Sequence, residues 1–152
     1  MSRKTPKRRG GYSLIEVLFA IFLSAMCAMV LAAGMPIANS GRARADAYNK
    51  ATGLAQKQIE AIRTLGYPNA TASQLASVGL IDSSEPIATD TYSFTNVDSA
   101  SLDNPARILP SGTGRVTLEQ VDLDLRRVTV EIRWMDRSVQ KSVKVGSLIA
   151  NL

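Results

Sequence analysis

The sequence predicts an α+β protein in which a long amino-terminal helical spine packs on a small antiparallel β-sheet head. Residues 14–33 form an apolar run that is long enough for a transmembrane helix. Residues 42–65 place apolar side chains at helical spacing, and residues 128–134 alternate apolar and polar side chains like a half-buried strand. Four parts are therefore expected: a basic leader (1–11), a hydrophobic helix (12–37), an amphipathic helix (38–66) and a head (67–152).

The apolar run contains one charged residue, Glu16. At about 1.5 Å of rise per residue, the run forms a helix about 30 Å long, which matches the thickness of a bilayer core. A carboxylate inside a bilayer costs about 2–4 kcal/mol, so Glu16 either has a function or lies at the headgroups in the first helical turn. The large side chains expected to line the membrane or a helix bundle are Leu14, Ile15, Val17, Leu18, Phe19, Ile21, Phe22 and Leu23.

Positive charge is concentrated before the apolar run. The formal net charge is +5, and five of the 18 basic residues lie in the first eleven positions, which contain no acidic residue. The other 13 basic residues equal the 13 acidic residues in number, so the rest of the chain is formally neutral. The positive-inside rule then predicts a cytoplasmic amino terminus and an exported carboxyl-terminal head. A general preference for nucleic acid loses its main support.

The junction between the leader and the apolar run, GYSLIE at residues 11–16, resembles the processing site of type IV pilin-like proteins, the prepilins and pseudopilins. That family has a short basic leader, a glycine, an aromatic or other apolar residue, and a glutamate at the fifth mature position. Tyr12 stands where phenylalanine is more usual. The resemblance covers the first third of the chain. It implies that a prepilin peptidase cleaves after Gly11 and methylates the new amino group of Tyr12.

The same resemblance implies a role in assembly for Glu16, which would pair with the amino group of Tyr12 in its own or a neighbouring subunit. Other pilin or pseudopilin subunits, an inner-membrane assembly platform and membrane lipid are the implied partners. The chain would cross the inner membrane once and then join a periplasmic or extracellular filament. The short head and the lack of a cysteine pair favour a minor pilin or pseudopilin, of a type IV pilus or a type II secretion-type filament, over a major pilin.

Gly34 and Pro36 predict a kink in the spine, because proline removes a backbone donor from the helix. The resemblance implies that the helix loosens here when subunits pack in a filament, and a simple kink at the membrane interface is the alternative. Gly66 followed by Pro68 predicts the end of the amphipathic helix. The apolar stripe of that helix, expected to be an ordinary core face, contains Tyr48, Ala51, Leu54, Ala55, Ile59, Ile62 and Leu65.

The head is expected to hold three or four antiparallel strands. Residues 92–97 and 116–121 are predicted strands, and residues 128–134 form a hairpin with the segment from Val139 to Val145 across a turn at 135–138. A short helix is expected over 72–78, ahead of Gly79. Trp134 is interpreted as a core residue that covers the contact between spine and sheet.

The composition favours a structural protein rather than an enzyme. The chain has no histidine and one cysteine, Cys27, so imidazole bases, imidazole metal sites and thiolate zinc sites are excluded. Asp122 and Asp124 are expected on one face of a strand, with no substrate cleft indicated. The oxygen-bearing residues Asn96, Asp98, Asp103 and Asn104 do not follow a known calcium-loop spacing, which favours a solvated loop. No metal or cofactor is expected.

Three other interpretations stay open. A conventional signal sequence would be cleaved near Ala32, Ala33 and Gly34, although the apolar run is longer than a typical signal core. A single-pass membrane protein that keeps its leader would use the head as an extracytoplasmic binding module. A DNA-uptake (competence) pilin would need a basic patch on the head. The candidate residues are Arg126, Arg127, Arg133, Arg137, Lys141 and Lys144, and interleaved Asp122, Asp124, Glu131 and Asp136 favour a mixed-charge surface instead.

Overall fold

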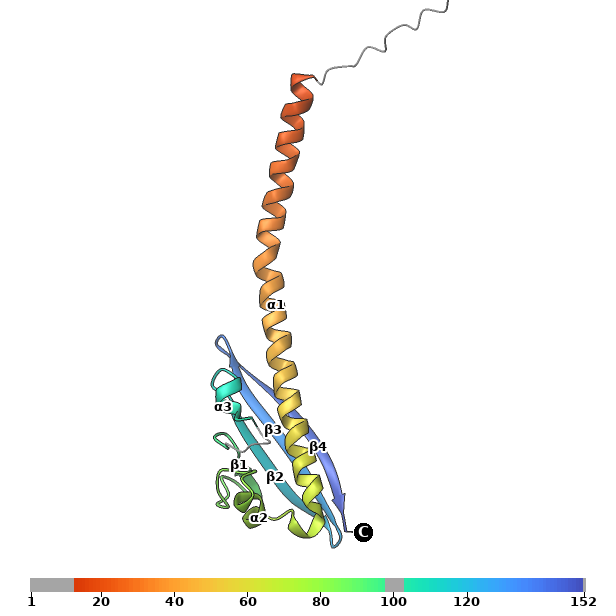
Figure 1. Cartoon of the computed structure of the whole chain (residues 1–152), viewed down its shortest axis with the longest axis vertical. Helices are drawn as coiled ribbons and strands as arrows, with labels where there is room; N and C mark the ends of the chain where they lie inside the picture. The colour runs from red at the N-terminus through yellow and green to blue at the C-terminus, as the bar shows by residue number, and fades with distance from the viewer. Residues whose placement is uncertain (1–12, 98–102, 152) are drawn as a thin grey trace, which may run out of the picture. The chain divides into compact units, whose positions relative to one another are not determined.

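The computed structural model describes residues 13–97 and 103–151 (Figure 1). The chain divides into two compact units, Met1–Arg42 and Ala43–Leu152, and we call the second the head unit. Helix α1, Leu14–Asn69, begins in the first unit and ends in the head unit. The other elements lie in the head unit: α2 (Ala72–Ser77), β1 (Thr91–Ser93), α3 (Pro105–Ile108), β2 (Thr113–Asp122), β3 (Leu125–Asp136) and β4 (Val139–Ala150).

The strands form one antiparallel sheet in the order β1-β2-β3-β4. Val116, Val130 and Val145 are aligned across β2, β3 and β4, which fixes one apolar face of the sheet. The part of α1 in the head unit packs on that face, so the predicted pilin-like α+β fold of a long helix on an antiparallel sheet is confirmed. The predicted short helix is also present, as α2, and Gly79 follows it with a positive φ of 70°.

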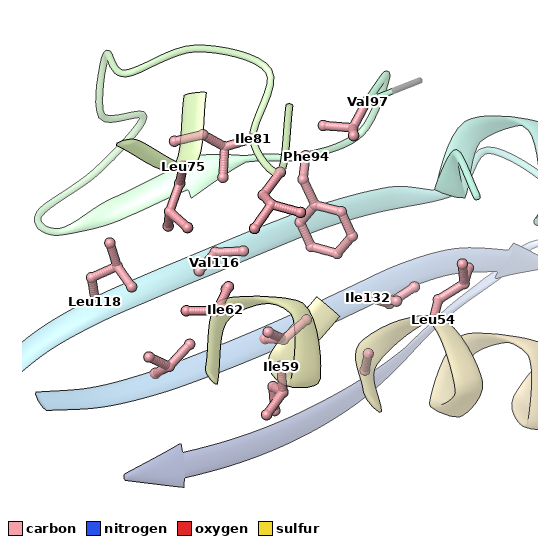
Figure 2. Packing of buried hydrophobic residues seen from close by; sticks show 14 of the residues in the cluster. Leu54, Ile59, Ile62, Leu75, Ile81, Phe94, Val97, Val116, Leu118 and Ile132 are labelled. Atoms are coloured by element: carbon pink, nitrogen blue, oxygen red, sulfur yellow. The ribbon is translucent and has the colours of Figure 1, made fainter. Parts of the chain in front are cut away.

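The core of the head unit lies between α1 and the sheet. Figure 2 shows Leu54, Ile59 and Ile62 of α1 among the buried residues, with Val116 of β2 and Ile132 of β3 beside them. In β3 the buried residues alternate with half-buried ones, as the sequence pattern predicts. The buried members of β3 are Val128, Val130, Ile132 and Trp134.

Trp134 is a core residue, as predicted from its place in the alternating pattern. Its side chain is 3% exposed, and its ring meets the ring of Tyr48 edge-on with 5.7 Å between the centroids. Near this contact, the Arg44 guanidinium lies 3.0 Å from the Asp136 carboxylate. These contacts join the beginning of the head unit's helix to the tip of the β3–β4 hairpin.

Gly66 interrupts the helical backbone where the sequence predicts the end of the amphipathic helix. Its φ of 75° and ψ of 168° are not helical, and one further turn follows to Asn69. Gly34 and Pro36 keep helical backbone angles. Within the described α1, the position with non-helical angles is Gly66. The loosening that the family resemblance implies at Gly34 and Pro36 concerns the assembled filament and stays a prediction.

Two local predictions need correction. Asp122 and Asp124 do not share a strand face, because Asp122 ends β2 and Asp124 lies in the turn before β3. The Asp122 carboxylate accepts the Leu123 N–H within this turn. The strand predicted over 92–97 is shorter, since β1 ends at Ser93. Beyond it, the N–H groups of Thr95 and Asn96 donate to the Asp82 carboxylate rather than to a neighbouring strand.

Candidate assembly helix

Glu16 lies in the first turn of α1. The backbone N–H groups of Glu16 and Val17 donate to the carbonyl of Ser13, at 2.9 and 3.2 Å, and thereby start the helix. A carboxylate in the first turn is favoured by the positive end of the helix dipole. The helix therefore holds Glu16 at its amino-terminal end, four positions after Tyr12 in the sequence. Gly11 and Tyr12 themselves lie outside the described residues.

The large apolar side chains that follow from Leu14 are exposed rather than packed within the chain. Their exposed fractions run from 48% for Val17 to 81% for Leu14. The other predicted members of this surface, all within that range, are Ile15, Leu18, Phe19, Ile21, Phe22 and Leu23. The helix is long and apolar enough to cross a membrane, with a mean hydropathy of 2.5 over its most apolar 18 residues. An apolar surface of this extent indicates contact with lipid or with other helices.

One face of the helix beside Glu16 has small side chains. Ala20 and Ser24 follow Glu16 at steps of four residues, and together with Val17 and Ile21 they line a shallow groove. The Ser24 hydroxyl donates to the Ala20 carbonyl at 2.7 Å, so its donor is satisfied within the helix. Small side chains at this spacing let a neighbouring helix approach closely.

The amino-terminal region matches a known sequence family. Residues 6–32 match the prokaryotic N-terminal methylation motif. The chain carries the N-terminal methylation motif typical of type IV pilin-like proteins. The matched range contains Gly11, Tyr12 and Glu16, and the pilin-like fold of the rest agrees with it. No curated protein and no solved structure matches the chain.

Several basic residues of the head unit form ion pairs with neighbouring acidic side chains. Arg133 and Lys144 lie 2.8 and 3.6 Å from the Glu131 carboxylate. Partial burial would raise the pKa of the Glu131 carboxyl, but the hydrogen bond and charge of Arg133 and the charge of Lys144 outweigh it. The pKa of Glu131 is therefore held below its ordinary value. Arg127 pairs with Glu119 at 3.0 Å.

The Arg126 side chain also has partners within the head unit. Its guanidinium lies over the Tyr67 ring, 5.0 Å from the centroid, and donates to the carbonyl of Ala70. The Tyr67 hydroxyl donates to the Leu123 carbonyl at 2.6 Å. Arg126 therefore links the end of α1 to β3. Of the six basic residues considered for a nucleic-acid patch, four have partners in the head unit: Arg126, Arg127, Arg133 and Lys144.

In the described part of the chain, no group of three acidic, histidine or cysteine side chains is placed to hold a metal ion. Two of the candidate calcium ligands have other partners. The Asp103 carboxylate pairs with Lys57 at 3.1 Å. The Asn104 side chain accepts the Ala106 N–H at 2.8 Å and caps α3. Asp98 lies outside the described residues.

Two polar residues have structural roles that were not predicted from the sequence. Gln58 is fully buried, and its amide nitrogen donates to the Leu80 carbonyl at 2.5 Å. Its position midway between Leu54 and Ile62 on the apolar stripe was a usable signal. The Asp82 carboxylate accepts the Ser93 hydroxyl at 2.6 Å and orders the segment after β1. No sequence pattern marks Asp82 for this role.

Proposed function

We propose that this pilin-like protein is a structural subunit, a minor pilin or pseudopilin, of a type IV pilus or a type II secretion-type filament. The methylation motif at residues 6–32 carries the proposal, because it opens a helix whose apolar side chains lie exposed. The head unit, by contrast, buries its own core. In this proposal the first part of α1 mediates assembly into the filament, and the head unit is the folded domain attached to it.

Maturation begins with cleavage after Gly11 by a prepilin peptidase on the cytoplasmic side, followed by methylation of the Tyr12 amino group. Glycine before the scissile bond has no side chain that would keep the backbone from the peptidase active site. The basic leader holds this end of the chain in the cytoplasm until it is removed. Before assembly, the apolar part of α1 anchors the subunit in the inner membrane, with the head on the extracytoplasmic side.

Assembly then uses the new amino terminus and Glu16. In a medium of low dielectric, pairing the Tyr12 ammonium with the Glu16 carboxylate offsets the desolvation of both charges. A pair between neighbouring subunits would also set the register of their helices. The small side chains of Ala20 and Ser24 beside Glu16 support close helix packing. An inner-membrane platform would add the subunits one by one to the filament.

The decisive experiment is the mass and amino-terminal sequence of the protein from membranes and from sheared filaments. We expect a chain that begins at Tyr12 and is heavier by one methyl group. A Gly11→Val variant should keep its leader, whereas the matched Gly10→Val variant should be processed, because position 10 lies outside the scissile bond.

Other outcomes lead to other functions. A wild-type chain that begins at Met1 or Ser2 would favour an unprocessed membrane protein with an extracytoplasmic binding head. A chain that begins near Gly34 would indicate a secreted head released from a conventional signal sequence. Both results would contradict the filament proposal.

A further inference from the structure

Charge is distributed unevenly along the sequence of the head unit. Residues 82–104 contain five acidic residues and no basic one. Residues 137–152 contain three basic residues, Arg137, Lys141 and Lys144, and no acidic one. We call residues 82–90, the start of the first segment, the acidic segment. We call β4 together with Arg137 the basic edge.

The fold puts these two regions at opposite edges of the sheet. β1 is one edge strand and β4 is the other (Figure 1). The acidic segment is held beside β1, because the Asp82 N–H donates to the Ser93 carbonyl and the Ile87 N–H donates to the Thr91 carbonyl, at 2.7 and 2.8 Å. Three strand spacings of about 4.8 Å separate β1 from β4, so the regions lie more than about 10 Å apart within one head.

The charged groups at both edges are available for a partner. Glu85, Asp90, Arg137 and Lys141 are all exposed. Within the part of the chain that the structure describes, none of these four side chains takes part in an ion pair. On its outer side, β4 has no neighbouring strand among the described elements. A strand edge with unpaired backbone groups is a ready docking surface.

We propose that the basic edge of one head docks the acidic segment of a second copy, with Arg137 and Lys141 facing Glu85 and Asp90. This inference rests on the proposed filament function, in the form in which copies of this chain are neighbours along the filament, and adds the surface through which their heads meet. Contact between two copies of the basic edge would bring like charges together, which is unfavourable. Contact between two different surfaces instead repeats from copy to copy and, where the rotation between copies does not close a ring, builds the open chain that a filament requires.

Cysteine cross-linking tests this arrangement directly in the full-length protein. In a Cys27→Ser background, Glu85→Cys and Lys141→Cys are introduced separately and together, and membranes and filament fractions are oxidised. The double variant should give a ladder of covalent oligomers, because its two cysteines are too far apart to bond within one head. Each single variant should give little dimer.

Two cross-linking results would overturn the proposal. A double variant that stays monomeric under oxidation would show that the two surfaces do not meet. Strong dimerisation of the Lys141→Cys variant alone would show that the basic edge meets itself.

Charge reversal gives an independent measurement. Lys141→Glu and Glu85→Lys should each lower the amount of assembled protein about 5- to 10-fold, since each brings like charges together across the contact. The combined variant restores opposite charges and should recover most of the loss. Arg107→Glu, on α3, is the matched control for a change of two charge units and should assemble normally.

The proposed filament function and the proposed docking surface can be refuted by different results. If Glu16→Ala abolishes assembly while the Lys141 and Glu85 reversals leave it intact, the filament function stands and the docking proposal is wrong. If the reversed pair does not rescue the single losses, the two surfaces do not face each other. If the mature chain keeps its leader and the double-cysteine variant still forms a ladder, the heads associate without belonging to a processed filament.

Discussion

The two parts of helix α1 use apolar side chains in opposite ways. Before residue 43, large apolar side chains such as Leu18 and Phe22 are more than half exposed. In the head unit, Leu54 and Ile62 are 4% and 0% exposed, because they pack against the sheet. The second part thus helps its own chain to fold. The first part has an apolar surface that no described residue covers, which indicates partners outside the chain.

The largest expected effect is on filament assembly, and it comes from a change in the first part of α1. Glu16→Ala should reduce assembled protein about 100-fold or more, because breaking a desolvated charge pair costs about 3–5 kcal/mol. Membrane insertion and the stability of the head should stay unchanged. Quantitative immunoblots of sheared filaments and of membranes measure both, with Glu60→Ala on the exposed side of the head's helix as the control. Normal incorporation of the Glu16→Ala protein would contradict the assembly role.

The second prediction compares one core residue with one exposed residue of the same helix. Ile62→Ala should lower the free energy of unfolding by about 2–5 kcal/mol, because it opens a cavity in the head's core. Leu23→Ala should leave it unchanged, since Leu23 is 57% exposed. Denaturant unfolding of the full-length protein in detergent, followed by Trp134 fluorescence, measures both. Equal losses would show that the two parts of α1 do not differ as described.

The elements with strong periodicity could be predicted from the sequence. The alternation from Val128 to Trp134 specified both the strand and its buried face. The stripe from Tyr48 to Leu65 specified the packed face of the helix except at Tyr48, which is 52% exposed. The long apolar helix was also predictable, because an uninterrupted apolar run of this length favours a helix. These features depend on local spacing, which the sequence displays directly.

Features that depend on contacts between distant segments could not be predicted. The early end of β1 follows from Asp82, whose carboxylate takes the N–H groups of Thr95 and Asn96. The burial of Gln58 depends on the carbonyl of Leu80, 22 residues away. Asp124 was misplaced because the turn after Asp122 contains no glycine or proline to mark it. For Asp82 and Gln58, a polar group finds a distant partner that no local pattern specifies.

The third prediction tests a close approach inside the head. A Cβ atom on Gly114 would lie less than 3 Å from the ring of Phe94, which is 2% exposed and packed in the core. Gly114→Ala should therefore lower the free energy of unfolding by about 1–3 kcal/mol. Gly146→Ala is the matched control, because the nearest atoms to its Cβ would be 3.8 Å away. A smaller loss at Gly114 than at Gly146 would contradict the packing described around Phe94.

The smallest expected effect concerns the ion pairs on the outer surface of the sheet. Because Arg133 and Lys144 hold the pKa of Glu131 below its ordinary value of 4.5, the ionised carboxylate stabilises the folded head. That contribution is fully present above the pKa of the unfolded chain and is lost as the pH falls through the lower pKa of the folded state. Glu131→Gln should therefore cost about 0.5–1 kcal/mol near neutral pH and almost nothing in strong acid.

Unfolding free energies of the wild type and Glu131→Gln, measured from neutral to strongly acidic pH, test this difference. Arg133→Met supplies the control, because without the arginine the partial burial of Glu131 opposes ionisation and the stabilising effect of the charge should shrink. A wild-type advantage that grows as the pH falls would mean that the pKa of Glu131 is raised instead. The ion pairs with Arg133 and Lys144 would then be too weak to offset the burial of this carboxylate.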